Sequence, residues 1–169
     1  LGIENVGQIF TRGVLLDIAA VRGVEMLEEG DEITIEDLKK ALETQDIEIK
    51  PGDAVILHTG WGSLWHTENE RFNTLEPGIG TEAALWLAKQ DVALIGSDTW
   101  ALEVLPNLSN PNSPFNVHQI LITEHGINIL ENLVTEELAA DGIYEFAFML
   151  TPLEIQGATA SNISPAAYY

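Results

Sequence analysis

Short apolar runs bounded by turn residues recur along this 169-residue chain and limit it to folds that contain a buried sheet. Residues 13–18, 54–59 and 92–96 are almost entirely apolar, as expected of strands that are covered on both faces. Two further segments of alternating character, 127–130 and 144–150, are also expected to be strands. An all-helical fold is therefore not expected.

Helices are expected between several of these strands, because apolar residues recur there at helical spacing. The predicted helices cover about 35–45, 81–89, 116–124 and 135–140. Thr34 and Asp37 resemble a capping box, and Thr81 is placed to cap the second helix. Gly126 occupies a plausible C′ position after the third helix.

The order of these elements indicates an α/β protein. Some strands follow one another without an intervening helix, which argues against a pure doubly wound sheet. The segment 60–80 is rich in glycine and aromatic residues, and 103–114 is rich in proline and asparagine, so both are expected to be loops. Because no repeat, low-complexity tract or linker divides the chain, residues 1–169 are expected to form a single domain.

The composition excludes several classes of protein. Acidic residues outnumber basic ones by 27 to 7, and a net charge of −20 repels phosphate, so no nucleic-acid partner is expected. The absence of cysteine excludes disulfides and thiolate zinc sites. No apolar run has the length of a membrane span and no signal-peptide pattern opens the chain, so we expect a cytoplasmic protein without membrane partners.

The charge is distributed unevenly. Residues 90–169 contain ten acidic residues and neither lysine nor arginine. A carboxylate that is buried in this half must therefore pair with backbone N–H groups, cations of the first half, another chain or a metal ion.

The four histidines differ in what they can do. His58 lies within an apolar strand and is expected to be a core or sheet-edge residue, His66 is expected to face solvent, and His125 to interact with a helix end. His118 lies in a helix that follows a proline-rich loop, and Glu131 comes directly after the apolar strand 127–130. Imidazole and carboxylate are ordinary ligands of zinc and manganese, so this pair is a weak candidate for part of a metal site.

Another group of candidates lies near the end of the predicted strand 92–96. Asp98 and Thr99 follow that strand, where pockets form in open α/β sheets. Aromatic side chains could line a ligand pocket or could belong to the core; they are Trp61, Trp65, Trp100 and Phe72. Phosphate-binding glycine motifs and a serine nucleophile elbow are absent.

Several strings in the sequence together resemble one family. They include RGVLLDIA (12–19), IKPGDAVILHTGWG (49–62), EPGIGTEAALWLAKQDVALIGSDTWALEVLP (76–106), FNVHQILITEHGINILENL (115–133) and ELAADGIYEFAFMLTPL (137–153). These strings are similar, in the same order, to the Putative cyclase family, which includes kynurenine formamidase, isatin hydrolase and related metal-dependent hydrolases. The resemblance extends from about residue 12 to the end of the chain.

The resemblance implies a swivelling β/β/α fold and metal-dependent hydrolysis of a cyclic or aryl-linked amide, or of a lactone. By likeness, His118 and Glu131 match late metal ligands of the family, for which zinc or manganese is the expected ion. Trp61 matches an aromatic residue near the substrate pocket and Asp98 lies in a stretch beside it; with Trp100, these are the expected substrate-binding residues. The expected partner is a small-molecule substrate.

One signature of the family is missing. Its His-x-Gly-Thr-His-x-Asp string, which supplies most metal ligands and normally precedes the RGVLLD segment, does not occur here, and the first histidine is His58. We therefore expect this chain to be the C-terminal part of a longer domain, with a metal site that is incomplete without the N-terminal segment.

Two readings of function remain open at this point. In the first, the chain is part of a metal-dependent hydrolase whose N-terminal part is supplied elsewhere. In the second, it is a catalytically inactive remnant that serves as a binding or oligomerisation module. A truncated sheet exposes edge strands that another chain would cover, so the expected partner is a second copy of the chain (a homo-oligomer) or the missing N-terminal segment. A third, plainer option is an acidic protein without a small-molecule ligand.

Overall fold

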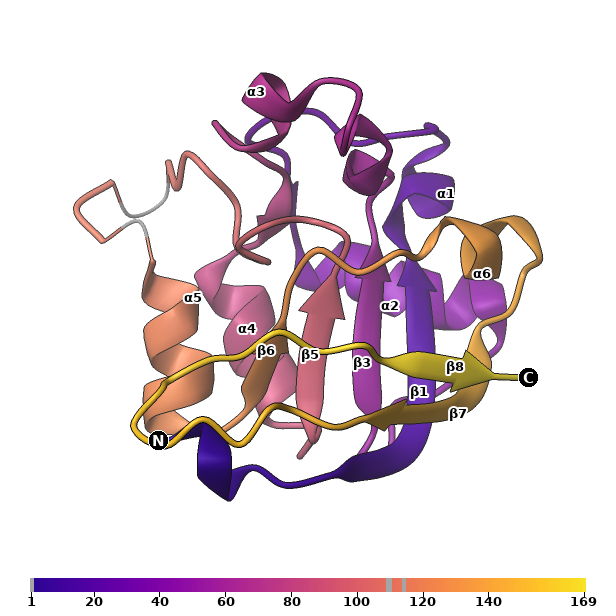
Figure 1. Cartoon of the computed structure of the whole chain (residues 1–169). Helices are drawn as coiled ribbons and strands as arrows, with labels where there is room; N and C mark the ends of the chain where they lie inside the picture. Colours follow the sequence, from indigo (N-terminus) through magenta and orange to yellow (C-terminus); the bar gives the residue numbers. More distant parts are fainter. Residues whose placement is uncertain (1, 109–110, 114) are drawn as a thin grey trace.

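The structure is a computed structural model, and it describes residues 2–108, 111–113 and 115–169. A six-stranded sheet with the order β6-β5-β3-β1-β7-β8 runs through the molecule (Figure 1). Strands β2 and β4 form a separate small sheet. The strands are β1 (Ile9–Asp17), β2 (Glu32–Ile33), β3 (Ala54–His58), β4 (Gly78–Ile79), β5 (Leu94–Ser97), β6 (Asn128–Leu130), β7 (Glu145–Leu150) and β8 (Ala166–Tyr168).

The helices connect these strands. They are η1 (Ile3–Asn5), α1 (Ile18–Arg22), α2 (Ile35–Gln45), η2 (Trp61–Leu64), α3 (Asn69–Phe72), α4 (Thr81–Ala88), α5 (Asn116–His118), η3 (Gln119–Glu124) and α6 (Glu136–Ala140). None of the helices in the described part of the chain has the length and hydropathy that crossing a membrane requires.

The sheet is mixed, as the order of the predicted elements indicated. Strands β6, β5, β3 and β1 are parallel, with β5 and β3 in the middle of this group. Strand β7 pairs antiparallel with β1, and β8 pairs antiparallel with β7. Strands β3 and β5 are short and fully buried, which explains why they appear in the sequence as continuous apolar runs. Their carboxyl ends all meet at one edge of the sheet.

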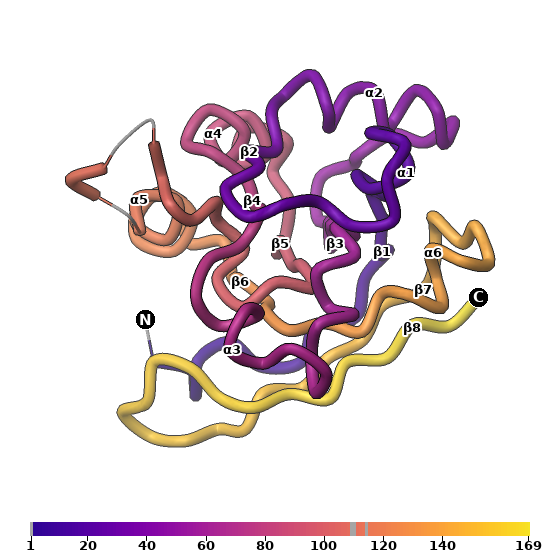
Figure 2. The backbone as a smooth tube through the Cα atoms, turned by 90° about the horizontal axis from the view of Figure 1, so that it is seen from above, coloured from indigo at the N-terminus to yellow at the C-terminus, as the bar shows by residue number. Residues whose placement is uncertain are grey.

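The two faces of the sheet are covered differently. Helices α1, α2, α4 and η3 pack on one face, and their apolar side chains form the main core with Leu16, Leu57 and Ile95 from the strands. On the other face, α6 and the C-terminal segment cover a smaller core around Leu15, Ile56 and Phe146 (Figure 2). The molecule is thus a three-layered α/β domain, in agreement with the predicted class.

Most of the predicted helix signals are confirmed. Thr34 and Asp37 form the capping box at the start of α2, and Gly126 adopts a left-handed conformation with φ +69° after η3. The prediction for Thr81 is wrong, because Gly80 is the N-cap of α4 and Thr81 is its first residue. The Thr81 hydroxyl instead accepts a hydrogen bond from the Asn116 side chain.

The predicted loops contain more structure than expected. Segment 60–80 includes η2, α3 and β4. In the loop 103–114, Glu103 and Leu105 make isolated bridges to Ile79 and Glu76. Residues 109–110 and 114 of that predicted loop lie outside the described residues.

Arg12 joins β1 to β7 and to the residue before β3, near the edge of the sheet at which β3 begins. Its guanidinium donates to both carboxylate oxygens of Asp53, at 3.1 and 2.7 Å, and to Glu145 at 2.7 Å. Asp53 is almost fully buried and precedes β3, whereas Glu145 begins β7. We expect Arg12→Ala to lower the free energy of unfolding by about 2–3 kcal/mol, because the Asp53 carboxylate loses its charged partner.

Urea unfolding checks this prediction, with Lys50→Ala as the matched control. Lys50 pairs with Glu48 at 3.0 Å, but both side chains are exposed, so its removal should cost no more than about 0.5 kcal/mol. Equal effects of the two substitutions would contradict the structural role of Arg12.

Candidate metal site and the polar edge of the sheet

Polar side chains lie where each parallel strand ends. Asp17 ends β1 and His58 ends β3, while Asp98 and Glu131 directly follow β5 and β6. Because the strand order is β6-β5-β3-β1, these residues form a row along one edge of the sheet. This is the edge at which open α/β sheets place their ligands.

The two predicted metal ligands lie at one end of this row. His118 is the last residue of α5, and its Nε2 atom is 3.3 Å from Oε1 of Glu131. The turn at Gly126 reverses the chain between η3 and β6, which brings the two residues together across thirteen positions of sequence. Sequence spacing alone could not have established this contact.

A third residue of this cluster is missed by the sequence analysis. Oε1 of Glu103 lies 2.6 Å from Nδ1 of His118 and accepts from the His118 backbone N–H at 3.2 Å. Oε2 of Glu103 accepts from the Val117 backbone N–H at 3.2 Å. An acidic residue in the apolar run ALEVL, in the half of the chain without lysine or arginine, is the signal that could have identified it.

The two carboxylates change the protonation of His118. The hydrogen bond to Glu103 and, as the second-largest cause, the hydrogen bond to Glu131 raise the pKa of His118 to about 9. Partial burial acts in the opposite direction. At neutral pH and without a metal ion, His118 therefore carries a proton on both ring nitrogens. A metal ion that binds Nε2 must displace the proton there.

The pair fits a metal ion as two of its ligands. Ligands of a tetrahedral zinc ion at about 2.1 Å lie about 3.4 Å from each other, close to the separation of His118 Nε2 and Glu131 Oε1. Within residues 2–108, 111–113 and 115–169, no group of three or more histidine, aspartate or glutamate residues is placed to hold a metal ion. His118 and Glu131 can thus supply part of a coordination sphere.

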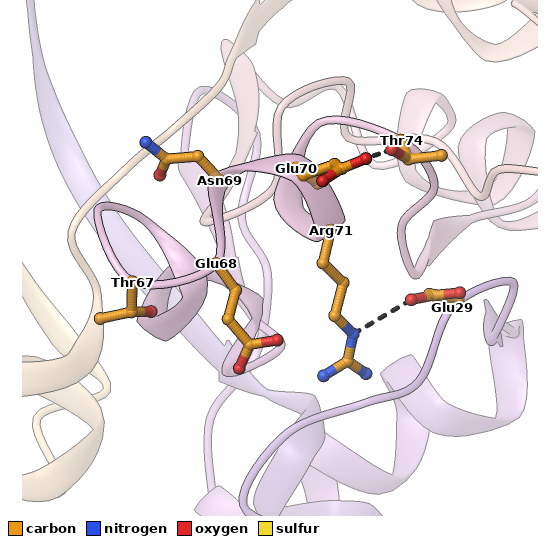
Figure 3. A pocket seen from close by; sticks show the side chains of 7 residues that line it. All are labelled: Glu29, Thr67, Glu68, Asn69, Glu70, Arg71 and Thr74. Atoms are coloured by element: carbon orange, nitrogen blue, oxygen red, sulfur yellow. Dashed lines mark hydrogen bonds and ion pairs between the residues drawn. The ribbon is translucent and has the colours of Figure 1, made fainter.

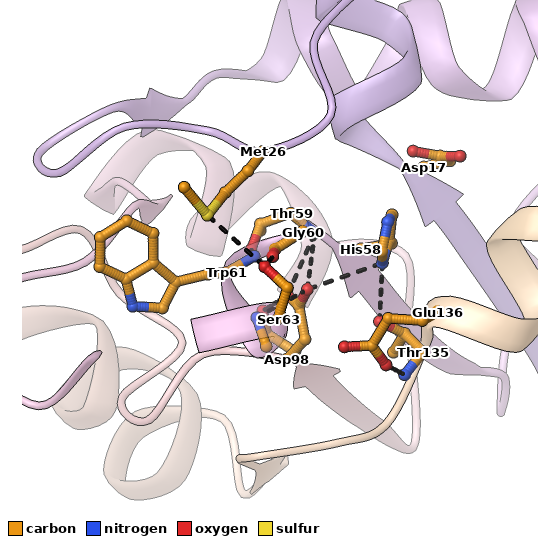
Figure 4. A network of polar contacts seen from close by, with 12 residues as sticks. Asp17, Met26, His58, Thr59, Gly60, Trp61, Ser63, Asp98, Thr135 and Glu136 are labelled. Carbon is orange, nitrogen blue, oxygen red and sulfur yellow. Dashed lines mark hydrogen bonds and ion pairs between the residues drawn. The ribbon is translucent and has the colours of Figure 1, made fainter. Parts of the chain in front are cut away.

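Asp98 occupies the centre of a second, buried network (Figure 4). Its carboxylate accepts hydrogen bonds from the backbone and hydroxyl of Thr59, at 3.0 and 2.7 Å, and from the Gly62 backbone at 3.5 Å. Burial raises the pKa of Asp98, while the nearby His58 opposes this shift. The network fixes the turn that follows β3.

His58 also belongs to this network. Its Nδ1 atom lies 2.7 Å from the Thr135 hydroxyl and 3.6 Å from Oδ2 of Asp98. The residue is 8% exposed, so the prediction of a core or sheet-edge histidine is confirmed. His66 and His125 are exposed.

Glu76 is a further buried carboxylate close to these groups. It accepts from the backbone N–H groups of Trp100 at 2.7 Å and Ala101 at 2.9 Å, and it is fully buried. Burial raises its pKa to about 8, although the two hydrogen bonds act in the opposite direction. As expected for the half of the chain without lysine or arginine, the buried carboxylates Asp98 and Glu103 pair with backbone N–H groups. Their contacts with His58 and His118 were not expected.

The predicted substrate-binding residues do not form one surface. Trp61 is fully buried in a small cluster with Leu64 and Phe72, and its ring projects away from His58 (Figure 4). Asp98 is likewise fully buried. Trp100 is partly exposed and lies near His118, because its ring contacts Phe115, whose ring contacts His118.

Two polar atoms at this edge have no hydrogen-bond partner in the described part of the chain. They are the Thr99 hydroxyl and the indole N–H of Trp100, and both are buried. Buried donors without a partner are uncommon in folded proteins. They are therefore candidates for contact with a bound molecule.

Two cavities lie away from His118 and Glu131. A polar one of about 580 Å³ is lined by residues of the α3 region, where Arg71 contacts Glu29 (Figure 3). A second, of about 340 Å³, lies between α6 and the C-terminal segment and has an apolar lining that includes Ile56, Phe146 and Phe148. Neither is lined by His118 or Glu131.

Comparison with solved structures identifies the fold. The chain matches a structure described as a novel cyclase over 100% of its own length, with 37% identity and a TM-score of 0.87. It matches isatin hydrolase A from Ralstonia solanacearum over 94% of its length, with 21% identity and a TM-score of 0.73. It also matches a potential metal-dependent hydrolase with cyclase activity over 94%, with 19% identity and a TM-score of 0.63.

This chain is shorter than all three of these proteins. It covers 56% of the novel cyclase, 60% of the isatin hydrolase and 65% of the potential metal-dependent hydrolase. A comparison with curated proteins gave no match. The sequence profile of the Putative cyclase family matches residues 3–104, which is more than half of the chain. The chain belongs to the Putative cyclase family.

Proposed function

We propose that this chain forms part of the active site of a metal-dependent hydrolase that cleaves a cyclic or aryl-linked amide, or a lactone. The main support for this proposal is the position of His118 between two carboxylates, with Nε2 at 3.3 Å from Glu131 and Nδ1 at 2.6 Å from Glu103. The family and its hydrolase relatives support this choice of reaction. The ion is proposed to be zinc or manganese, which suit imidazole and carboxylate ligands.

When it is bound, such an ion lowers the pKa of a coordinated water and polarises a substrate carbonyl. His118 and Glu131 would hold it through Nε2 and a carboxylate oxygen. Trp100 and Phe115 lie beside His118, so their rings could contact an aromatic or cyclic substrate. The indole N–H of Trp100, which has no partner among the described residues, could donate a hydrogen bond to a substrate oxygen.

His118 and Glu131 are too few ligands for a tightly bound metal ion. Two ligands hold a zinc or manganese ion weakly, and structural zinc sites use four. We therefore propose that further ligands come from a segment outside this chain or from another subunit. The greater length of the matched structures is consistent with that source.

Hydrolysis assays test this proposal. The chain, combined with the segment or subunit that supplies the remaining ligands and with Mn²⁺ or Zn²⁺, should hydrolyse at least one of isatin, N-formylkynurenine and a simple lactone above background. His118→Ala and Glu131→Ala should each remove that activity by at least about 100-fold, because each deletes a ligand. His125→Ala is the matched control, since this exposed histidine lies on the same segment and should leave the rate unchanged.

The alternative is an inactive binding or oligomerisation module. It is supported by the small number of ligands in the described residues. It predicts a folded oligomer with no turnover of any of the three substrates, with either ion. Activity that disappears in His118→Ala would reject this alternative, whereas activity that is equal in His118→Ala and the wild type would reject the metal-dependent reaction.

A further inference from the structure

Glu103 is held in a way that differs from the other carboxylates near His118. It is fully buried, and both of its oxygens accept hydrogen bonds. Its main chain is fixed as well, because Glu103 bridges Ile79 of β4 and because Gly78 packs directly against the Leu102–Glu103 backbone. The main chain of Glu103 is thus held by β4, and its carboxylate is held by the hydrogen bonds to residues 117 and 118.

Glu131 lies on the other side of the same ring and is accessible. Its side chain is 35% exposed, against 0% for Glu103, and it approaches Nε2 rather than Nδ1. The imidazole ring thus has a closed side and an open side. Only the open side, with Nε2 and Glu131, can take part in binding an ion from solution.

The hydrogen bond to Glu103 also selects which ring nitrogen keeps its proton. The proton of the 2.6 Å contact is placed on Nδ1 of His118, because Oε1 of Glu103 already accepts the His118 backbone N–H and acts as an acceptor here. The backbone N–H groups of Val117 and His118, which donate to the same carboxylate, fix it relative to α5. As a result, Nε2 is the nitrogen that can present a lone pair.

We propose that Glu103 is the positioning residue of the candidate metal site: it holds the Nδ1–H of His118 and thereby directs Nε2 toward Glu131 and an incoming ion. The effect of Glu103 on binding of the ion rests on the proposed function, whereas its effect on the orientation of the His118 ring does not. Carboxylates that orient a ligating histidine in this way strengthen binding of the metal ion without contacting it.

Nuclear magnetic resonance of the ¹⁵N-labelled chain tests this inference without any metal ion. The chain has only four histidines, and His118→Asn assigns the His118 ring. We expect a downfield, slowly exchanging Nδ1–H resonance for His118 in the wild type. It should shift upfield in Glu103→Gln, whose neutral amide is a weaker acceptor, and disappear in Glu103→Ala. Glu131→Gln should retain it.

Glu82→Gln is the matched control, because Glu82 is an exposed residue at the start of α4. Backbone amide spectra verify folding, and Glu103→Gln keeps the test decisive if Glu103→Ala does not fold. An Nδ1–H resonance of His118 that is the same in the wild type and in Glu103→Gln would overturn the inference.

Titration with Mn²⁺ extends the test to the ion itself, because paramagnetic broadening of the His118 ring reports even weak binding. Glu103→Gln should weaken this binding by about 10–100-fold, and Glu82→Gln should not change it. Equal affinity of Glu103→Gln and the wild type would overturn the positioning role. If the wild-type ring is not broadened at all, the proposed function fails. The Nδ1–H resonance alone then tests whether Glu103 orients the His118 ring.

Discussion

Gly60→Ala is expected to lower the free energy of unfolding by about 3–5 kcal/mol, one of the largest effects of a single methyl group in this chain. Gly60 has φ +78°, a conformation that costs an alanine about 1–2 kcal/mol. An added Cβ would also overlap the carbonyl oxygen of Glu25 and lie 2.9 Å from the Cα atom of Met26. Both are main-chain atoms, so the overlap cannot be relieved by rotating a side chain.

The backbone that would have to move is tied to the turn after β3. The N–H of Leu27 donates to the carbonyl of Thr59 at 2.9 Å, and Thr59 in turn donates to Asp98. A shift of the Glu25–Met26 segment therefore strains the same turn that Asp98 holds. This coupling is the reason for expecting a cost well above that of the φ angle alone.

Gly7→Ala separates the two contributions. Gly7 has a similar φ of +70°, but nothing lies within 4 Å of the position that its Cβ would occupy. Its replacement should therefore cost only about 1–2 kcal/mol. Urea unfolding of both variants measures the difference, and equal costs would show that the segment at Glu25 does not pack against Gly60 as described.

The second large effect is a loss of stability as the pH rises from 5 to 9. The pKa of Glu76 is raised to about 8 in the folded protein, whereas an unperturbed glutamate titrates near 4.5. Between these values the folded state binds more protons than the unfolded state, so the free energy of unfolding falls as the pH rises. The stability that Glu76 provides is fully present below about pH 4.5 and lost above about pH 8, with a total change on the order of 5 kcal/mol.

Two other groups change stability in the same direction. Burial raises the pKa of Asp98, and contact with Glu103 raises that of His118 to about 9. For His118 the raised pKa stabilises the folded state below about pH 6.5, and this contribution is lost as the pH approaches 9. The steepest loss is therefore expected between about pH 6.5 and 8, where the Glu76 and His118 windows overlap.

Urea unfolding at a series of pH values checks this profile and its assignment. Glu76→Gln should flatten the part between pH 4.5 and 8, although it should lower stability at pH 5 because one amide N–H now faces a backbone donor. His118→Asn should flatten only the part above pH 6.5. A free energy of unfolding that is constant or rises between pH 5 and 8 would contradict the buried, uncharged state of Glu76.

The fold could be predicted from the sequence to the extent that burial determines sequence pattern. Parallel strands β1, β3 and β5 are covered on both faces, and for that reason they appear as continuous apolar runs. The short strand β8 has no comparable signal, because its residues are only partly buried and its position depends on pairing with β7. The N-cap at Gly80 was missed because its extended backbone, rather than a side chain, starts α4.

The candidate site was predictable only in part. The resemblance to the family singled out His118 and Glu131, and the structure places them in contact. Glu103 and Glu76 were not singled out, since their importance depends on backbone N–H groups that come from distant segments. Trp61 illustrates the opposite case: an aromatic residue in a glycine-rich loop suggests a pocket, yet its ring is fully buried.

The proposed function requires that His118 and Glu131 together bind a metal ion. Anomalous diffraction from crystals of the chain grown with Zn²⁺ tests it most directly, with data collected on both sides of the zinc absorption edge. We expect an anomalous peak within about 2.0–2.2 Å of His118 Nε2 and of a Glu131 carboxylate oxygen, with Glu103 still hydrogen-bonded to Nδ1. A zinc-containing crystal with no peak beside His118, or with a peak bound only by other residues, would contradict it.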